Sequence, residues 1–118
     1  IDFMLFNSAT GKKIISKTRF AQGFFGNMKG LVFEREENFD YALVFPLPYE
    51  SRFGASVHMM FVFFPIDIVF LDAQKKVVDK ATLRPWMINY TPRAAAKYFI
   101  ELPIGCGEKI KVGDTLEW

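Results

Sequence analysis

Hydrophobic residues in this chain fall into short runs that are separated by single prolines, glycines and small polar groups. Runs rich in Val, Ile and Phe, or alternating between apolar and polar residues, are typical of β-strands. Asn7–Gly11 is a polar turn that predicts a hairpin between the first two runs, and Pro46 with Pro48 is expected to end the third. The pattern predicts strands over 2–6, 13–18, 41–45, 56–64, 66–71, 77–83, 97–102 and 115–118.

Apolar residues recur at helical spacing only in the stretch that follows Thr18, a residue that can cap a helix. We therefore predict one substantial helix from about Thr18 to Asn27, and a short helical turn over Gly107–Ile110. The fold class that follows is mostly β with one short helix, barrel-like or sandwich-like. Since no linker, repeat or composition break is visible, we expect one domain over residues 1–118.

Composition and charge exclude several classes of protein. The 118 residues are 51% hydrophobic, carry a net charge of +2 and include one Cys and one His. One Cys cannot form an internal disulfide, one Cys with one His cannot make an ordinary zinc site, and no nucleotide-binding glycine motif is present. We expect no cofactor and no metal. Neither an export signal nor an apolar run of membrane-spanning length is found, so we expect no membrane span and a cytoplasmic location.

Aromatic side chains are unusually frequent, with fourteen Phe beside four Tyr and two Trp. Most of the phenylalanines fall on predicted strands or on the predicted helix, where burying each one is worth about 1.5–3 kcal/mol. We expect them to form the core. Trp86 and Tyr90 lie in the irregular stretch 84–92 and are the aromatic residues that we expect to contact a partner.

Asp67 stands inside the apolar run 63–70. A buried carboxylate costs several kcal/mol unless charge or hydrogen bonds compensate, so Asp67 needs partners. Two interpretations are open: a structural carboxylate that accepts backbone N–H groups or pairs with an arginine, or the polar floor of a pocket with acid/base use. We expect Arg19 or Arg93 to be the partner.

His58 is the side chain whose ordinary pKa lies nearest neutrality. Because it stands beside Met59 and Met60 in an apolar run, we expect it to be packed and bonded to a backbone carbonyl. A nucleophilic pair with Cys106 is an alternative that needs the two side chains within hydrogen-bond reach.

Several segments together resemble a known family. They are Arg19–Phe24, Leu43–Pro46, Phe64–Asp72, Phe99–Gly105 and Val112–Asp114. In this order they are similar to an uncharacterised family of bacterial and archaeal proteins, the domain of unknown function family 192, also called uncharacterised ACR. The resemblance extends from about Lys17 onward. It implies a mostly β domain and no established activity.

One segment departs from the pattern of that family. The usual order there is Trp-Met-Lys-Asn-Thr, whereas the matching positions here are His58, Met59, Met60, Phe61 and Val62. The resemblance therefore implies that any function shared by the whole family rests on other residues.

Three functions remain open. A non-enzymatic binding or interaction module with an apolar pocket or groove near His58, Trp86 and Met87 is favoured, because residue types used in catalysis are scarce. The alternatives are an enzyme centred on Asp67 with an arginine, and a binder of single-stranded nucleic acid, which the low net charge argues against. The expected partner is a small molecule or a protein, and the residues do not determine an oligomeric state. The candidate binding residues are Arg19, His58, Asp67, Trp86 and Arg93.

Overall fold

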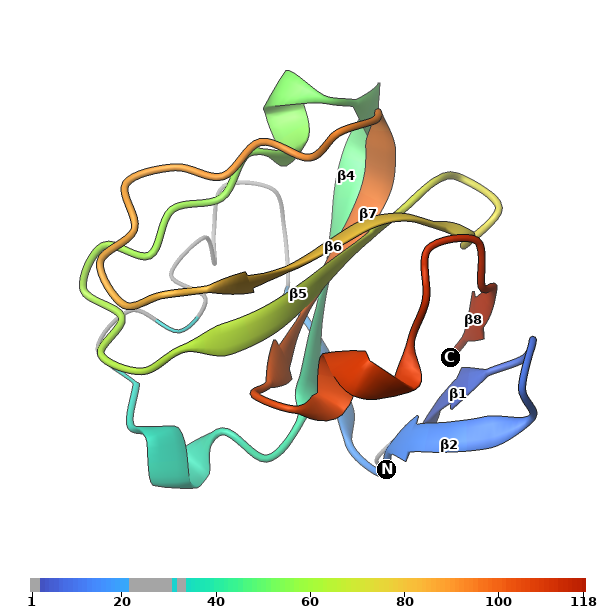
Figure 1. Cartoon of the computed structure of the whole chain (residues 1–118), viewed down its shortest axis with the longest axis horizontal. Coiled ribbons are helices and arrows are strands. Elements are labelled where there is room, and N and C mark those ends of the chain that lie inside the picture. Colours follow the sequence, from blue (N-terminus) through green and yellow to red (C-terminus); the bar gives the residue numbers. More distant parts are fainter. Residues whose placement is uncertain (1–2, 22–30, 32–33) are drawn as a thin grey trace.

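The computed structural model describes residues 3–21, 31 and 34–118. In this part of the chain the strands form two open sheets and close no barrel, so the prediction of a mostly β fold is confirmed (Figure 1). The smaller sheet has the order β2 (Lys12–Ile15), β1 (Leu5–Asn7), β8 (Leu116–Glu117). The larger sheet has the order β3 (Thr18–Phe20), β4 (Ala42–Ser51), β7 (Ala96–Pro103), β5 (Ile66–Leu71), β6 (Val77–Leu83). Short 3-10 helices lie at η1 (Glu36–Asn38), η2 (Phe53–Ala55) and η3 (Cys106–Lys109).

Both faces of the larger sheet are covered, and β5 shows this directly because all six of its residues are buried. Continuous apolar runs are typical of strands covered on both sides. Ile68 and Phe70 belong to a core between the sheet and the long irregular segments, whereas Val69 and Leu71 belong to a second core that includes residues of the smaller sheet.

The predicted hairpin is confirmed. β1 pairs antiparallel with β2, and Gly11 takes a φ of 72°, which glycine adopts without steric cost. The strands predicted over 66–71, 77–83 and 97–102 are also present as β5, β6 and β7. The helical turn predicted at 107–110 is present as η3, one residue earlier.

The predicted helix over Thr18–Asn27 is wrong at its start, and residues 22–27 lie outside the described residues. Thr18–Phe20 forms β3, which pairs parallel with Ala42–Val44 of β4. Ala21 continues the contact by donating its N–H to Val44 O. The edge of β4 thus provides hydrogen-bond partners for the backbone of residues 18–21, and this tertiary pairing overrides the helical periodicity of the side chains.

Two further strand predictions are corrected. β4 does not stop at Pro46 but continues to Ser51. Beyond Val44 it pairs with β7 alone, so its other side is a free edge, and an edge strand tolerates proline, which has no N–H. Residues 56–64 form no strand. Val57 makes a single bridge to Tyr90, and Phe61 takes a φ of 62°, a left-handed backbone that cannot continue a strand.

Candidate functional site

Asp67 fastens a glycine turn onto the larger sheet. Its Oδ1 accepts a hydrogen bond from Thr82 Oγ1 at 2.7 Å, and its Oδ2 accepts from the backbone N–H groups of Gly105 and Gly107, each at 2.8 Å. A Cβ added to Gly107 would lie 3.0 Å from Oδ2, a tight contact that would push against the carboxylate, so glycine suits the close approach. We call these four residues the Asp67 clamp. With three donors on two oxygens, the carboxylate is held as a structural acceptor.

The expected arginine partner of Asp67 is wrong. The guanidinium carbon of Arg19 lies 4.2 Å from the ring centre of Tyr41, and Arg93 Nε lies 4.0 Å from Asp79 Oδ1. Backbone donors take the place of the cation, because Gly105, just before η3, and Gly107, within η3, both direct their N–H groups to the carboxylate. Of the two interpretations of Asp67, the structural one fits this geometry.

A groove of about 260 Å³ lies beside the Asp67 clamp. Lys80 Nζ, on its wall, donates to Gly107 O at 3.0 Å and to Ile110 O at 2.8 Å. The lysine therefore holds η3 in place, and the groove contains few polar groups that are available to a ligand. Its lining residues are Asp67, Ile68, Lys80, Ala81, Thr82, Ile104, Gly105, Gly107 and Glu108.

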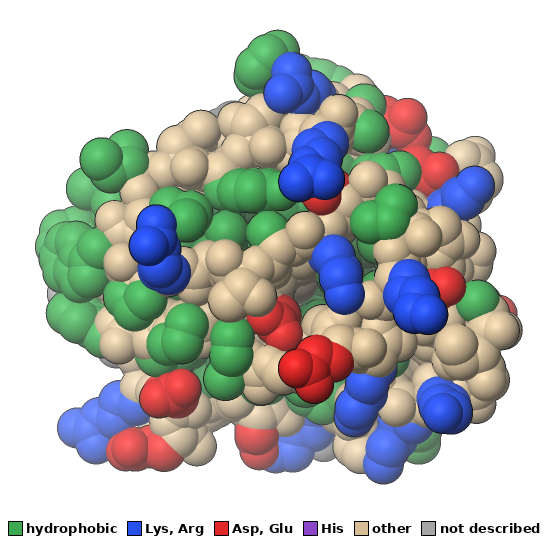
Figure 2. Space-filling model, viewed as in Figure 1, with side chains coloured by type: hydrophobic (Ala, Val, Ile, Leu, Met, Phe, Trp, Pro, Cys, Tyr) green, Lys and Arg blue, Asp and Glu red, His purple; other side chains and the backbone are tan. Residues whose placement is uncertain are grey.

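A second region lies where the segment before β5 meets the segment after β6, at the left of Figure 1. Met59 is buried and connects the two segments, since its N–H donates to Met87 O at 2.7 Å and its O accepts from Trp86 N at 2.9 Å. The side chains that flank this junction are exposed, and Figure 2 shows hydrophobic side chains gathered on this edge of the molecule. We call the exposed apolar set the aromatic tip: Met60, Phe61, Phe63, Trp86 and Ile88.

Within the aromatic tip, the ring of Trp86 contacts the rings of Phe61 and Phe63. The Trp86 ring centre lies 4.9 Å from that of Phe61 and 5.5 Å from that of Phe63, the latter pair edge to face. Phe61 and Trp86 also have left-handed backbones, with φ of 62° and 65°. Such a conformation is common for glycine but uncommon for a residue with a bulky side chain, in which it costs about 1–3 kcal/mol. Two strained residues thus hold exposed rings, which is an arrangement expected at functional sites.

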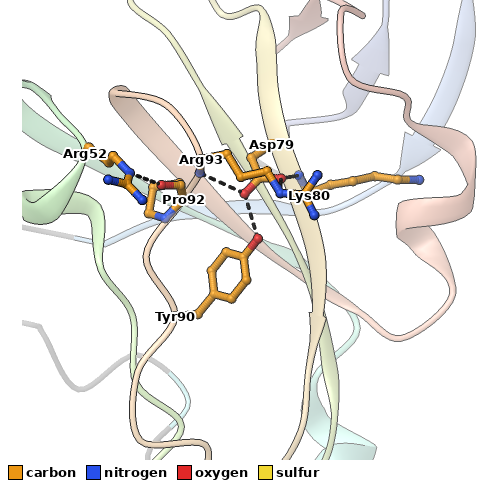
Figure 3. A network of polar contacts seen from close by, with 6 residues as sticks. All are labelled: Arg52, Asp79, Lys80, Tyr90, Pro92 and Arg93. Carbon is orange, nitrogen blue, oxygen red and sulfur yellow. Dashed lines mark hydrogen bonds and ion pairs between the residues drawn. The ribbon is translucent and has the colours of Figure 1, made fainter.

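A polar network around the buried side chain of Asp79 holds the segment that carries Trp86 (Figure 3). Asp79, which is buried in β6, accepts hydrogen bonds from Tyr90 Oη at 2.6 Å, Arg93 N at 3.1 Å and Lys80 N at 2.9 Å. Arg52 adds a bond from its Nε to Pro92 O at 2.8 Å. Burial, with the bond to Asp79, raises the pKa of Tyr90 to about 12, so the phenol stays protonated and donates.

Tyr90 is therefore a structural residue rather than the expected partner contact. Its ring also stacks on Phe70, with ring centres 5.7 Å apart. Trp86, in contrast, is 46% exposed and remains available to a partner.

His58 and Cys106 do not support a nucleophilic pair. His58 is exposed, and its Nδ1 accepts from Met60 N at 3.2 Å, so the expected packing against a backbone carbonyl is wrong. Cys106 is half-buried against the second core, and burial raises the pKa of its thiol above the ordinary value. A raised pKa disfavours the thiolate that a nucleophile needs.

The five predicted binding residues thus lie in three places. His58 and Trp86 lie on the two joined segments of the aromatic tip, and Arg93 follows on the second of them. Asp67 belongs to its clamp, and Arg19 lies at the other edge strand of the sheet, over Tyr41. Sequence reasoning missed the exposed rings of Phe61 and Phe63, because it assigned the phenylalanines to the core. Of the eleven in the described residues, five are buried: Phe39, Phe45, Phe64, Phe70 and Phe99.

Glu101 was also missed. It is 6% exposed in β7, and its register neighbours on the two adjacent strands are Leu43 and Ile68. Its Oε1 has no hydrogen-bond partner within the described part of the chain. Burial raises the pKa of Glu101 to about 8, so the side chain carries its proton at neutral pH.

Two negative findings apply to residues 3–21, 31 and 34–118. No group of three or more His, Cys, Asp or Glu side chains is placed to hold a metal ion. No helix in these ranges is both long enough and apolar enough to cross a membrane.

Comparisons with known proteins agree with the fold. A family model described as uncharacterised ACR matches residues 5–118. A UPF0127 protein of Pyrococcus abyssi is 42% identical over 117 residues, 98% of this chain and 97% of the relative. One of Thermococcus sibiricus is 41% identical over 117 residues, 98% of this chain and 74% of the relative. Among solved structures, a Novosphingobium aromaticivorans protein of unknown function superposes with a TM-score of 0.73 at 23% identity, covering 86% of this chain and 74% of that one. A Sinorhizobium meliloti protein, described as a proposed transcription regulator, gives 0.79 at 18% identity, covering 97% and 89%.

Proposed function

The chain belongs to the uncharacterised ACR family, domain of unknown function family 192, and within it we propose that this protein is a non-enzymatic binding module whose contact surface is the aromatic tip. The observation that carries the proposal is the exposed contact of Phe61, Phe63 and Trp86 on two segments joined through Met59. Aromatic residues, Met and Arg are enriched where proteins meet partners, and Trp is the commonest side chain among binding hot spots.

Backbone strain supports the same assignment. The family pattern stated above has Asn at the position of Phe61, and Asn adopts a left-handed backbone more readily than other non-glycine residues. Here Phe takes the same kind of backbone, with a φ of 62°. An aromatic ring is thus presented where the conformation alone favours a small polar residue, which indicates a use for the ring outside folding.

The charges around the aromatic tip indicate the character of the partner. No Asp or Glu occurs between residues 51 and 66 or between residues 80 and 100. The same two segments carry Arg52, Arg84 and Arg93, which are exposed. A partner with apolar groups and negative charge would meet both features.

The Asp67 clamp supports an enzymatic function less well. General acid/base catalysis requires a carboxyl group that can reach a substrate and exchange a proton with it. Asp67 is 6% exposed, and three donors from the protein occupy its oxygens. We therefore assign the clamp to folding rather than to chemistry.

Site-specific photocrosslinking tests the proposed contact surface. A photoreactive residue replaces Ile88 at the aromatic tip, and a control replaces Val112, which is also exposed but lies in the turn beside Val77, where β6 begins. These positions flank opposite ends of β6, a strand of seven residues that is about 20 Å long. We expect the Ile88 position to crosslink one identified molecule in the native cell extract, and Trp86→Ala to abolish the product.

The crosslinked molecule is then purified and titrated with the unmodified chain. Weaker binding by the Trp86→Ala chain, by about tenfold, supports the proposal, since Trp truncation at a hot spot costs at least that much. Equal crosslinking from Ile88 and Val112, or none from Ile88, contradicts it.

A further inference from the structure

The aromatic tip has a composition that differs from an ordinary protein surface. Ile88 is 81% exposed and Phe63 is 58% exposed, and none of its five side chains carries a charge. Trp86 supplies one hydrogen-bond donor, the indole N–H. Phe, Trp, Ile and Met side chains with one polar edge are the set that partitions into the interface of a lipid bilayer.

The tip is carried by two loops rather than by a sheet face. The segments before β5 and after β6 meet at one end of these strands, and in Figures 1 and 2 they form the left edge of the molecule. A bilayer adapts its surface to whatever shape is inserted, whereas a protein partner needs a complementary pocket. Rings presented at such an edge can enter a lipid interface without a preformed site.

Exposed arginines accompany the tip on the same segments. Arg84 stands between β6 and Trp86, and Arg93 has a side chain that is 86% exposed. Arg93 Nε forms an ion pair at 4.0 Å with Asp79, and the high exposure of the arginine side chain leaves the outer part of its guanidinium group in contact with solvent. Guanidinium groups bind phosphate oxygens well.

From these observations we infer that the aromatic tip docks on an anionic lipid surface, with Trp86, Phe63 and Ile88 in the headgroup region and Arg84 and Arg93 on lipid phosphates. This inference rests on the proposed function and names its partner. The docking is peripheral and reversible, since a few apolar side chains with two or three cations give modest affinity.

Vesicle binding of the 118-residue chain tests the inference. The probes are vesicles of phosphatidylcholine alone and vesicles of equimolar phosphatidylcholine and phosphatidylglycerol. A Trp118→Phe background leaves Trp86 as the reporter; Trp118 belongs to the other end of the molecule, where it packs against Tyr98 and Lys75. We expect co-sedimentation and a blue shift of Trp86 emission with the anionic vesicles, both reduced by added salt.

Matched variants locate the contact. Ile88→Glu should lower the partition coefficient by at least about tenfold, whereas Val112→Glu should leave it unchanged, because only the first adds charge and removes apolar area at the interface. Arg84→Gln should lower it by about fivefold on anionic vesicles, the share of one cation near the surface. Arg35→Gln, at the exposed residue just before η1, should have no effect.

Three results would overturn the inference: no binding to anionic vesicles, equal loss from Ile88→Glu and Val112→Glu, or tighter binding to a single-stranded oligonucleotide than to vesicles. If the chain does not bind vesicles, but the photoreactive residue at position 88 captures a protein and Trp86→Ala abolishes that product, the lipid partner is wrong and the proposed binding function is supported. If both experiments fail, the proposed function fails as well.

Discussion

The Asp67 clamp and the aromatic tip lie at the same end of the β5–β6 pair, yet they treat their side chains in opposite ways. In the clamp, a buried carboxylate has three hydrogen bonds and a glycine at close approach. At the tip, Phe61 and Trp86 keep left-handed backbones while their rings stay exposed. A fold gains stability from the first arrangement and loses it in the second. The contrast indicates that the clamp serves folding and that the tip serves binding.

The largest expected effect is in the clamp. Asp67→Ala leaves the buried N–H of Gly107 without an acceptor, and with it the more exposed N–H of Gly105 and hydroxyl of Thr82. We expect the free energy of unfolding to fall by at least about 3 kcal/mol, measured by urea denaturation. Glu108→Ala, an exposed change on the same groove, should alter it by less than about 0.5 kcal/mol. A similar small loss for both variants would mean that the clamp is not a folding element.

The buried acid in β7 tests whether polar groups outside the clamp are also satisfied. The pKa of Glu101 is raised from the ordinary 4.5 to about 8 by burial. Below about pH 4.5 both the folded and the unfolded state are protonated, so stability is complete. Between that pH and about 8 the unfolded state loses its proton first, and stability falls as pH rises, by about 1.4 kcal/mol per pH unit at most.

Glu101→Gln should remove that slope. We expect the variant to exceed the wild type by about 2 kcal/mol at pH 8 and to match it more closely at pH 5, in chemical denaturation at each pH. Glu117→Gln, in β8 on an exposed position, is the control and should leave the pH profile unchanged. A wild-type profile that is flat between pH 5 and 8 would show that Glu101 has a partner in solution.

Sequence patterns predicted some parts of this contrast and not others. The strands β5 and β6 follow from β-branched runs with a polar break at residues 72–76, so the position of Asp67 in a buried strand was foreseeable. The prediction that Asp67 needs hydrogen-bond partners, because burying a charge is costly, was also correct. The donors were not foreseeable, because Gly105 and Gly107 come close only through the register of β5 with β7.

The tip escaped prediction for a different reason. Hydrophobicity argues for burial, but Phe61 and Phe63 lie on a segment that leaves the sheet, where a single bridge and a few loop bonds replace a strand. Neither Phe61 nor Trp86 is a residue type that signals a left-handed backbone. Such exceptions to local rules are expected where function, not folding, selects the residue.

A moderate effect is expected where the tip is attached to the sheet. Tyr90→Phe removes the 2.6 Å hydrogen bond to Asp79 while two backbone donors remain. We expect a loss of about 1–2 kcal/mol in the free energy of unfolding, with faster proteolysis between residues 84 and 93. Tyr49→Phe, an exposed phenol on β4, should change stability by less than about 0.5 kcal/mol. Equal losses of stability from Tyr90→Phe and Tyr49→Phe would mean that the Asp79 network does not hold the aromatic tip in place.

The smallest effect on stability is expected at Phe61. Phe61→Asn gives up ring contacts with Trp86, worth about 0.5–1.5 kcal/mol, but relieves a left-handed backbone whose cost is of similar size. The two terms oppose each other, so the free energy of unfolding should change by less than about 1 kcal/mol. Phe64→Asn is the matched control, because Phe64 is buried, and it should cost at least about 3 kcal/mol. If Phe61→Asn weakens partner binding in the crosslinking assay while stability stays near that of the wild type, the ring at this position serves contact rather than folding. A loss of stability as large as that of Phe64→Asn would instead place Phe61 in the core and contradict the contrast between the clamp and the tip.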